Sequence, residues 1–225
     1  MSRSVRVPTL VAASVLVLAS CSSGGSSPQT SPTPSASPTP TSLAEVDVGA
    51  LPVVRTAFCD AVEADAVEAA LGGPVAETAH YADGERARLT GDVRDVAHEN
   101  GCTFLGADGV RARTWLFVPP VTPAEARELV AAAERTEGCA PRPDAPAYGE
   151  PSTALLCGAE GGGAEGGGTE GGGPVEATYR GLIGDAWLSC SLREPREVYE
   201  AGGGREGLLA RTDAWCLEAA SAAAT

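Results

Sequence analysis

Lysine is absent from this chain, methionine occurs once, and phenylalanine, tryptophan and tyrosine together make up 4% of its 225 residues. No Cys-x-x-Cys pair is present, and the two histidines, His80 and His98, sit at no metal-ligand spacing, which argues against a zinc site. A Gly-x-Ser-x-Gly motif is also missing, and neither histidine has an obvious partner for activating a serine. We therefore expect no metal, no cofactor and no catalytic residue, and predict that the chain is not an enzyme.

The charge of the chain is strongly one-sided. Sixteen arginines stand against 30 acidic residues, which gives a net charge of −14. Because negative charge repels nucleic-acid phosphates, we expect no nucleic-acid partner. The same surplus disfavours a domain that lies flat on anionic lipid, and solubility is its simplest explanation.

The N-terminus has the layout of an export signal. Arg3 and Arg6 precede an uncharged, largely apolar run at residues 7–20, like the first two regions of a secretory signal. This run is shorter than the roughly 20 residues that a membrane-spanning helix needs. Residues 1–20 are therefore predicted to be a signal peptide that is removed on export.

Leu18-Ala19-Ser20-Cys21 resembles the lipobox of bacterial lipoproteins, in which small residues precede a cysteine that is lipidated and becomes the mature N-terminus. The resemblance implies that Cys21 anchors the protein at the outer face of the cytoplasmic membrane through acyl chains such as palmitate. Two acyl chains make a stable anchor, whereas one binds only marginally. The alternative is an ordinary secretory signal that is cleaved nearby and releases the protein.

The next segment, residues 21–43, begins with Cys21 and is otherwise almost entirely Ser, Thr, Pro and Gly. Ordering such a segment would cost conformational entropy without burying apolar surface in return. Its prolines favour extended polyproline II conformation. We therefore predict a disordered stalk that lifts a single extracytoplasmic domain, residues 44–225, off the membrane.

Six cysteines remain beyond Cys21, and an even number in an exported chain indicates disulfides. Many pairings are open from sequence alone. We predict that neighbours along the chain pair, as Cys59–Cys102, Cys139–Cys157 and Cys190–Cys216. Closing a loop of the size of 139–157 would stabilise the fold by about 3 kcal/mol.

Apolar residues at helical spacing predict three main helices. The first follows a short turn at 58–62, with a capping box formed by Asp65 and Glu68, and ends at Gly72. The second begins at Thr122, with Glu125 completing a capping box and Leu129 in its buried stripe. The third covers about 206–223 and presents Cys216 to the sheet.

Alternating segments predict strands at 102–105, 110–118, 153–157, 175–182 and 186–192. Both faces of the 110–118 segment carry apolar residues toward its C-terminal end, so we expect this strand to be central. Residues 78–100 are expected to be an exposed connection or a weak strand, and 158–173 a flexible Gly-rich insertion. The predicted fold is α+β: an antiparallel sheet of about five strands with three helices packed against it, stapled by disulfides.

Two motifs resemble a family of actinobacterial cell-envelope lipoproteins of uncharacterised function. They are the segment 59–72, in which a cysteine heads a short helix ending in Leu-Gly, and the strand Cys102-Thr103-Phe104. The family usually has Trp where Phe104 stands. Related extracellular domains resemble the PsbP-like α+β fold. The resemblance implies an envelope-associated binding or sensing module and supplies no catalytic residues.

One aromatic residue is a weak candidate for a binding site. On its strand, Trp187 points to the face opposite to that of Leu188 and Cys190, so it is the tryptophan best placed to line a pocket. Capping and a solvated helix face explain the acidic residues of the first helix better than paired catalytic carboxylates do: Glu63, Asp65 and Glu68.

The predicted function is a membrane-anchored, non-enzymatic binding, sensing or accessory module with an unknown small-molecule or protein partner. The anchor, the stalk and the missing active-site motifs motivate this interpretation. The alternative is an envelope-remodelling hydrolase that uses dispersed acidic residues.

Overall fold

The structure of the chain is a computed structural model that describes residues 42–90, 93–159 and 172–225. The predicted signal peptide, the lipidation site Cys21, nearly all of the predicted stalk and most of the Gly-rich insertion lie outside the described residues. Leu43, at the expected end of the stalk, is only 2% exposed and belongs to the hydrophobic core. The folded part of the chain therefore includes Leu43.

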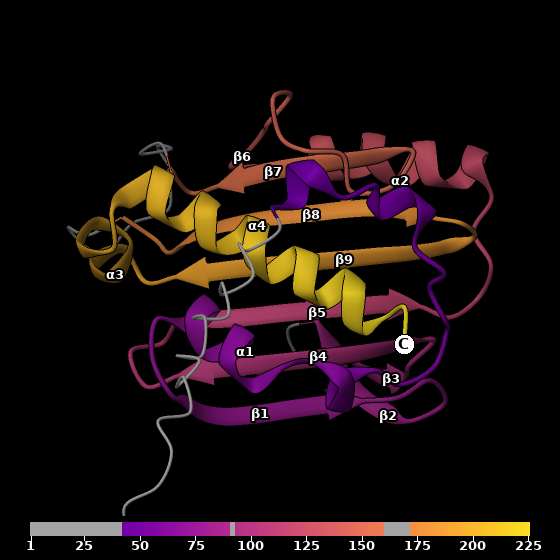
Figure 1. The fold of residues 1–225 in the computed structure, drawn as a ribbon, viewed down its shortest axis with the longest axis horizontal. Helices are drawn as coiled ribbons and strands as arrows, with labels where there is room; N and C mark the ends of the chain where they lie inside the picture. Colours follow the sequence, from indigo (N-terminus) through magenta and orange to yellow (C-terminus); the bar gives the residue numbers. More distant parts are fainter. Residues whose placement is uncertain (1–41, 91–92, 160–171) are drawn as a thin grey trace, which may run out of the picture. The chain divides into compact units, whose positions relative to one another are not determined.

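A seven-stranded antiparallel sheet and a separate two-stranded hairpin hold the described strands (Figure 1). In chain order the strands are β1 (Val75–Tyr81), β2 (Arg86–Thr90), β3 (Val93–Val96), β4 (Glu99–Gly106), β5 (Arg111–Phe117), β6 (Cys139–Pro141), β7 (Ser152–Cys157), β8 (Val175–Ile183) and β9 (Ala186–Glu194). The large sheet has the order β1-β4-β5-β9-β8-β7-β6, and β2 pairs with β3. β5 therefore lies inside the sheet, as predicted.

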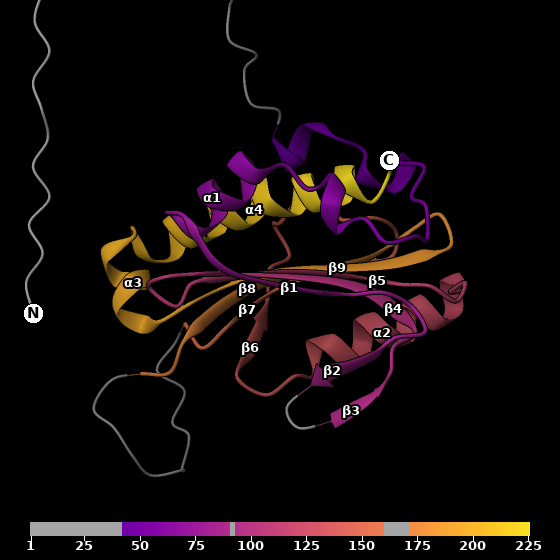
Figure 2. The same ribbon diagram turned by 90° about the horizontal axis from the view of Figure 1, so that it is seen from below.

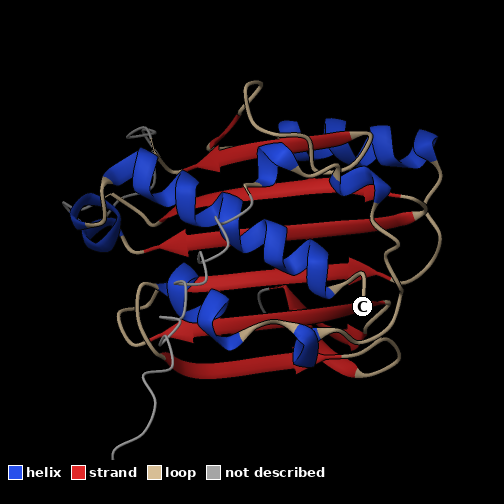
Figure 3. Ribbon diagram, in the orientation of Figure 1, coloured by secondary structure: helices blue, strands red, loops and turns tan. Residues whose placement is uncertain are grey.

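Helices cover both faces of the sheet. They are α1 (Ala64–Leu71), α2 (Pro123–Glu134), α3 (Arg196–Ala201) and α4 (Gly204–Ala222), with short 3-10 turns η1 (Leu43–Glu45), η2 (Val48–Ala50) and η3 (Cys59–Ala61) before α1. Figure 2 shows α1, α4 and the 3-10 turns on one face, with α2 and the β2–β3 hairpin on the other. Figure 3 shows that the face under α4 is covered along most of the strand length.

The main core lies between α4 and the sheet. Cys216 faces the sheet as predicted, and it belongs to an inward stripe of α4 whose members are all buried: Leu208, Thr212, Trp215, Cys216 and Ala219. Trp215 meets Phe104 of β4 edge-on, with ring centroids 5.8 Å apart. A second, smaller core lies on the opposite face beneath α2, where Trp187 packs with Val121 and Ala126.

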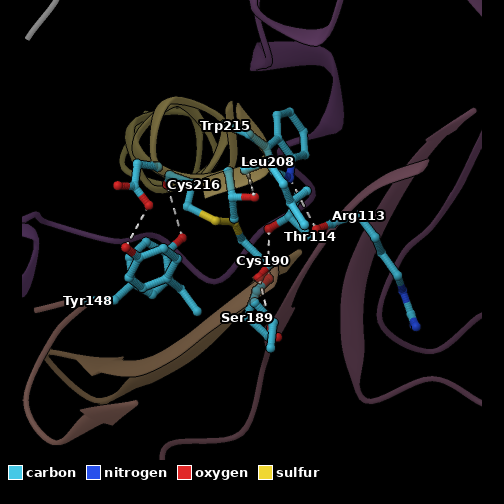
Figure 4. Close-up of a disulfide and its surroundings, with 12 residues drawn as sticks. Arg113, Thr114, Tyr148, Ser189, Cys190, Leu208, Trp215 and Cys216 are labelled. Carbon is cyan, nitrogen blue, oxygen red and sulfur yellow. Dashed lines mark hydrogen bonds between the residues drawn. A yellow bond between two sulfur atoms is a disulfide. The ribbon is translucent and has the colours of Figure 1, made fainter. Parts of the chain in front are cut away.

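All three predicted disulfides are present: Cys59–Cys102, Cys139–Cys157 and Cys190–Cys216. The Cys190–Cys216 bond ties the middle of β9 to α4 within the main core (Figure 4). The Cys139–Cys157 bond joins directly paired residues of β6 and β7, whose Cα atoms lie 3.9 Å apart. Each bond joins cysteines that are neighbours among the six along the chain, but only Cys139–Cys157 joins elements that follow one another directly, β6 and β7.

The predictions of about five strands and three helices are wrong, because the sheet has seven strands and the described residues include four α-helices. The unpredicted strands β1 and β6 both lie at sheet edges. Five of the seven residues of β1 are exposed, so the strand has no apolar alternation. β6 is three residues long and ends at Pro141, and a proline is tolerated at an edge. With six residues, α3 is too short to show a helical stripe.

One of the two predicted capping boxes exists. At α2 the Thr122 side chain accepts from the Glu125 amide, and the Glu125 carboxylate accepts from the Thr122 amide. The box predicted at Asp65 is wrong, because α1 begins at Ala64 and has no side-chain cap bond at its N-cap, Glu63. The end of α1 at Gly72 is as predicted, with a positive φ of 74° that favours glycine.

The buried stripe predicted for α2 is partly wrong. Ala126 and Ala133 are buried against the sheet, but Leu129 is 40% exposed. Small residues carry the contact between α2 and the sheet, so the buried face of the helix is narrow. Leu129 lies outside that face and instead borders a shallow surface cavity with Phe117.

Candidate anion-binding site

The structure does not bring together the residues that the sequence offered for chemistry. Trp187 is 3% exposed and packed beneath α2, so it lies in a core and not at an accessible surface. His80 is exposed on β1, and the His98 side chain is 71% exposed, with Nδ1 3.9 Å from Asp83 Oδ1. The acidic residues of the first helix are also exposed: Glu63, Asp65 and Glu68.

A cavity of about 570 Å³ has walls from both the large sheet and the β2–β3 hairpin. Among the residues that line it are five arginines from three strands: Arg86 and Arg88 on β2, Arg111 and Arg113 on β5, and Arg193 on β9. We call this the arginine cavity. In a chain whose net charge is −14, it is a local reversal of the overall charge.

Strand alternation explains why the β5 arginines lie on this side of the sheet. Successive side chains of a strand point to opposite faces. Ala112 and Thr114 are fully buried and belong to the α4 side, so Arg111 and Arg113 point the other way. Figure 4 shows the Arg113 side chain extending away from the Cys190–Cys216 bond.

The strand register places two positive side chains directly against each other. Arg111 of β5 pairs with Arg193 of β9, and like charges directly opposite destabilise a sheet. Among the described residues, the arginine–carboxylate ion pairs involve neither of them; they involve Arg55, Arg142 and Arg211. On its other side Arg193 pairs in register with Glu176 of β8, so one carboxylate lies on the same face beside the two arginines, although it forms no ion pair with either among the described residues.

The pKa of Arg111 is lowered. Burial of the side chain is the main cause, and the charge of Arg193 lowers the pKa further, whereas the charge of Glu176 raises it. Burial likewise lowers the pKa of Arg180, which shares this face of the sheet on β8. Within the described part of the chain, the buried Arg180 Nε has no hydrogen-bond partner. The charge of Glu176 raises the pKa of both Arg111 and Arg180, so this carboxylate serves the two guanidinium groups together.

Tyr81 of β1 forms one wall of the arginine cavity. Its hydroxyl donates to Glu99 Oε1, and Arg113 Nη2 donates to the hydroxyl oxygen over 3.4 Å. Burial and the bond to Glu99 raise the pKa of Tyr81 to about 12, so the phenol is protonated at neutral pH. The ring lies across Gly101, its cross-strand partner, where a Cβ atom would collide with it. Tyr81 is thus held in place and helps to position Arg113.

Part of this site has a signal in the sequence, although the residue types alone do not point to a binding site. Arg-Ala-Arg occurs twice, at 86–88 and at 111–113, and in both the alanine is buried between outward arginines. Alternation of this kind predicts two strands with an arginine on either side of a buried residue. The opposition of Arg111 and Arg193 has no such local signal, because it depends on the pairing of two strands far apart in the chain.

Comparison of the chain with protein-family models gives no match, and comparison with curated proteins gives none either. No helix in the described ranges is long and apolar enough to cross a membrane. Those same ranges contain no group of three or more His, Cys, Asp or Glu side chains that could hold a metal ion. The site is therefore interpreted from its own geometry.

Proposed function

We propose that this chain is a non-enzymatic binding module, held outside the cytoplasmic membrane by a lipid on Cys21, that binds anions in the arginine cavity. The observation that carries the proposal is the direct opposition of Arg111 and Arg193 in a half-buried wall, with no carboxylate ion pair to either among the described residues. Such an arrangement costs stability in the free protein. An anion between the two guanidinium groups would turn that cost into a favourable interaction.

The chemistry of the guanidinium group favours oxyanions. Its planar donors form paired hydrogen bonds with phosphate or carboxylate oxygens. Because the chain has no lysine, the use of arginine in place of lysine does not indicate a ligand. The positions of the arginines are what indicate one. Partial burial lowers the local dielectric constant and so strengthens each contact with an anion.

The groups around the cavity suit binding better than turnover. General acid–base catalysis needs a group whose pKa lies near the working pH. Arginine does not give up its proton in proteins, and Tyr81 has a pKa of about 12. His80 borders the cavity from an exposed strand and, among the described residues, has no hydrogen-bond partner that would orient it. No observation favours the hydrolase alternative, since its candidate carboxylates lie on exposed α1.

Calorimetric titration of the mature full-length chain with inorganic phosphate, at constant ionic strength, tests the proposal. Wild type should bind, Arg111→Lys should bind more weakly because it keeps the charge but loses the planar fork, and Arg111→Gln should lose binding. Arg205→Gln is the matched control, because Arg205 is exposed on α4 across the sheet. If neither phosphate nor sulfate binds to wild type, the proposal is wrong.

The anchor is tested separately with Cys21→Ala. Wild type should remain with the membrane fraction, because two acyl chains are a stable anchor. The variant should appear in the medium or stay as an unprocessed precursor. Identical fractionation and migration of the two proteins would contradict the anchor without affecting the anion site.

A further inference from the structure

A second arginine-lined cavity adjoins the first. It has a volume of about 480 Å³, and its lining includes Leu105, Pro195, Arg196 and the same Arg111 and Arg193 that line the arginine cavity. The opposed pair is therefore a wall common to both cavities. Arginines line both cavities from β2 to the start of α3, with the carboxylates of Glu85 and Glu197 also in the linings and Glu176 paired in register with Arg193.

Arg196 is fixed within this second cavity. Its Nη2 donates to the Gly158 carbonyl, and its guanidinium carbon lies 5.5 Å from the centroid of the Tyr199 ring. Its Nε atom is buried and has no hydrogen-bond partner among the described residues. Arg196 is thus a positioned cation with a buried donor still unused.

The arginines are spaced in steps along the strands. Arg113 and Arg111 are two residues apart on β5, which corresponds to about 7 Å of strand. Arg193 lies opposite Arg111, and Arg196 follows shortly after it in the chain. A ligand that meets all of these arginines must carry several anionic groups in a row.

We propose that the two cavities form one groove that binds a short linear chain of phosphate groups. This inference rests on the proposed anion-binding function and specifies its ligand. Phosphate fits because each group offers three strong acceptor oxygens and a high negative charge, enough for more than one guanidinium. The chain must be short: each cavity wall also carries an exposed carboxylate, Glu85 or Glu197, and the protein as a whole repels polyanions.

Titrations of the mature full-length chain with orthophosphate, pyrophosphate and tripolyphosphate, at one ionic strength, test this inference. Tripolyphosphate should bind at least about tenfold more tightly than orthophosphate, because it adds charge-assisted hydrogen bonds. Arg196→Gln should remove most of that gain and should weaken orthophosphate binding less than Arg111→Gln does. Arg205→Gln should change neither affinity. Arg196→Lys, which keeps the positive charge, should retain part of the gain and shows that the loss is not one of folding.

The outcomes separate this inference from the proposed function. Equal affinity for orthophosphate and tripolyphosphate would overturn the groove and leave the anion site standing. No binding of any of the three would overturn both. Tighter binding of a thymidine oligonucleotide than of tripolyphosphate would also overturn the short-chain ligand, because it would mean that the groove accepts a long polyanion.

Discussion

Arg111 and Arg193 face each other directly across β5 and β9, in the wall that two cavities share. The register of two interior strands fixes their Cα atoms as direct partners, so the two side chains leave the sheet side by side on one face. The pair belongs to a sheet whose opposite face is a conventional apolar core under α4. The face that carries the two arginines also holds the smaller core beneath α2, so the electrostatic cost is confined to the part of that face that the cavities occupy.

Removing one of the opposed charges should therefore stabilise the free protein. Arg111→Met keeps an apolar stem of similar length and removes the charge. We expect the free energy of unfolding in urea, measured without phosphate at low salt, to rise by about 0.5 kcal/mol, the usual scale of a cross-strand charge effect. The gain should shrink as salt is added, because screening weakens the repulsion that the substitution removes.

The matched control for that substitution is Arg205→Met, which removes a charge of the same sign from exposed α4. It should stabilise the acidic chain no more than any surface change does. In the presence of phosphate the order should invert, because wild type gains binding energy that Arg111→Met lacks. A loss of stability in Arg111→Met without phosphate would show that the two charges are not in repulsion.

Two of the three disulfides should differ in how much they contribute to the free energy of unfolding. The Cys190–Cys216 and Cys139–Cys157 bonds span 26 and 18 residues, so loop closure alone predicts a similar contribution of about 3 kcal/mol each. Cys190 and Cys216 are also almost fully buried, at 1% and 0% exposure, whereas Cys139 and Cys157 lie at a sheet edge. Replacing the buried pair by alanine should therefore cost more in chemical denaturation than replacing the edge pair. Equal losses would mean that chain entropy alone decides their contribution.

The wall of the arginine cavity can be disturbed at one backbone position. Gly101→Ala places a Cβ atom against the Tyr81 ring, and overpacking of this kind typically costs about 1–3 kcal/mol. Displacing Tyr81 should also remove its hydrogen bond with Arg113 and weaken phosphate binding. Gly73→Ala is the control, because nothing lies within 4 Å of its added Cβ atom. If Gly101→Ala costs the same in a Tyr81→Ala background, the ring is not the cause.

Local patterns in the sequence predict part of this fold, and of its site they indicate only the two Arg-Ala-Arg segments. β5 and the stripe of α4 can be recognised because an interior strand and a buried helix face have periodic apolar residues. The edge strand β1 cannot, because one sheet neighbour and mostly exposed side chains leave it without a pattern. Trp187 looks available for binding until α2 is seen to cover it. The opposition of Arg111 and Arg193 arises from pairing between distant strands, which no local pattern records.

Tyr81 gives the site a signature at high pH. Its pKa is raised to about 12 in the folded protein, against about 10 in an unfolded chain. The folded state therefore favours the protonated phenol, so this contribution to stability is complete below about pH 10 and is lost as the pH rises toward 12. Burial also raises the pKa of Tyr148 and Tyr179, so the informative quantity is the difference between wild type and Tyr81→Phe.

Tyr81→Phe should lose less stability than wild type between pH 10 and about 12, where Tyr81 titrates, measured by urea unfolding at each pH. In absorbance at alkaline pH, the variant should lack one late phenolate transition. Phosphate should shift that transition further upward in wild type, because a nearby anion disfavours a phenolate. A phosphate-independent transition would place the bound anion away from Tyr81 and from the Arg113 that it holds.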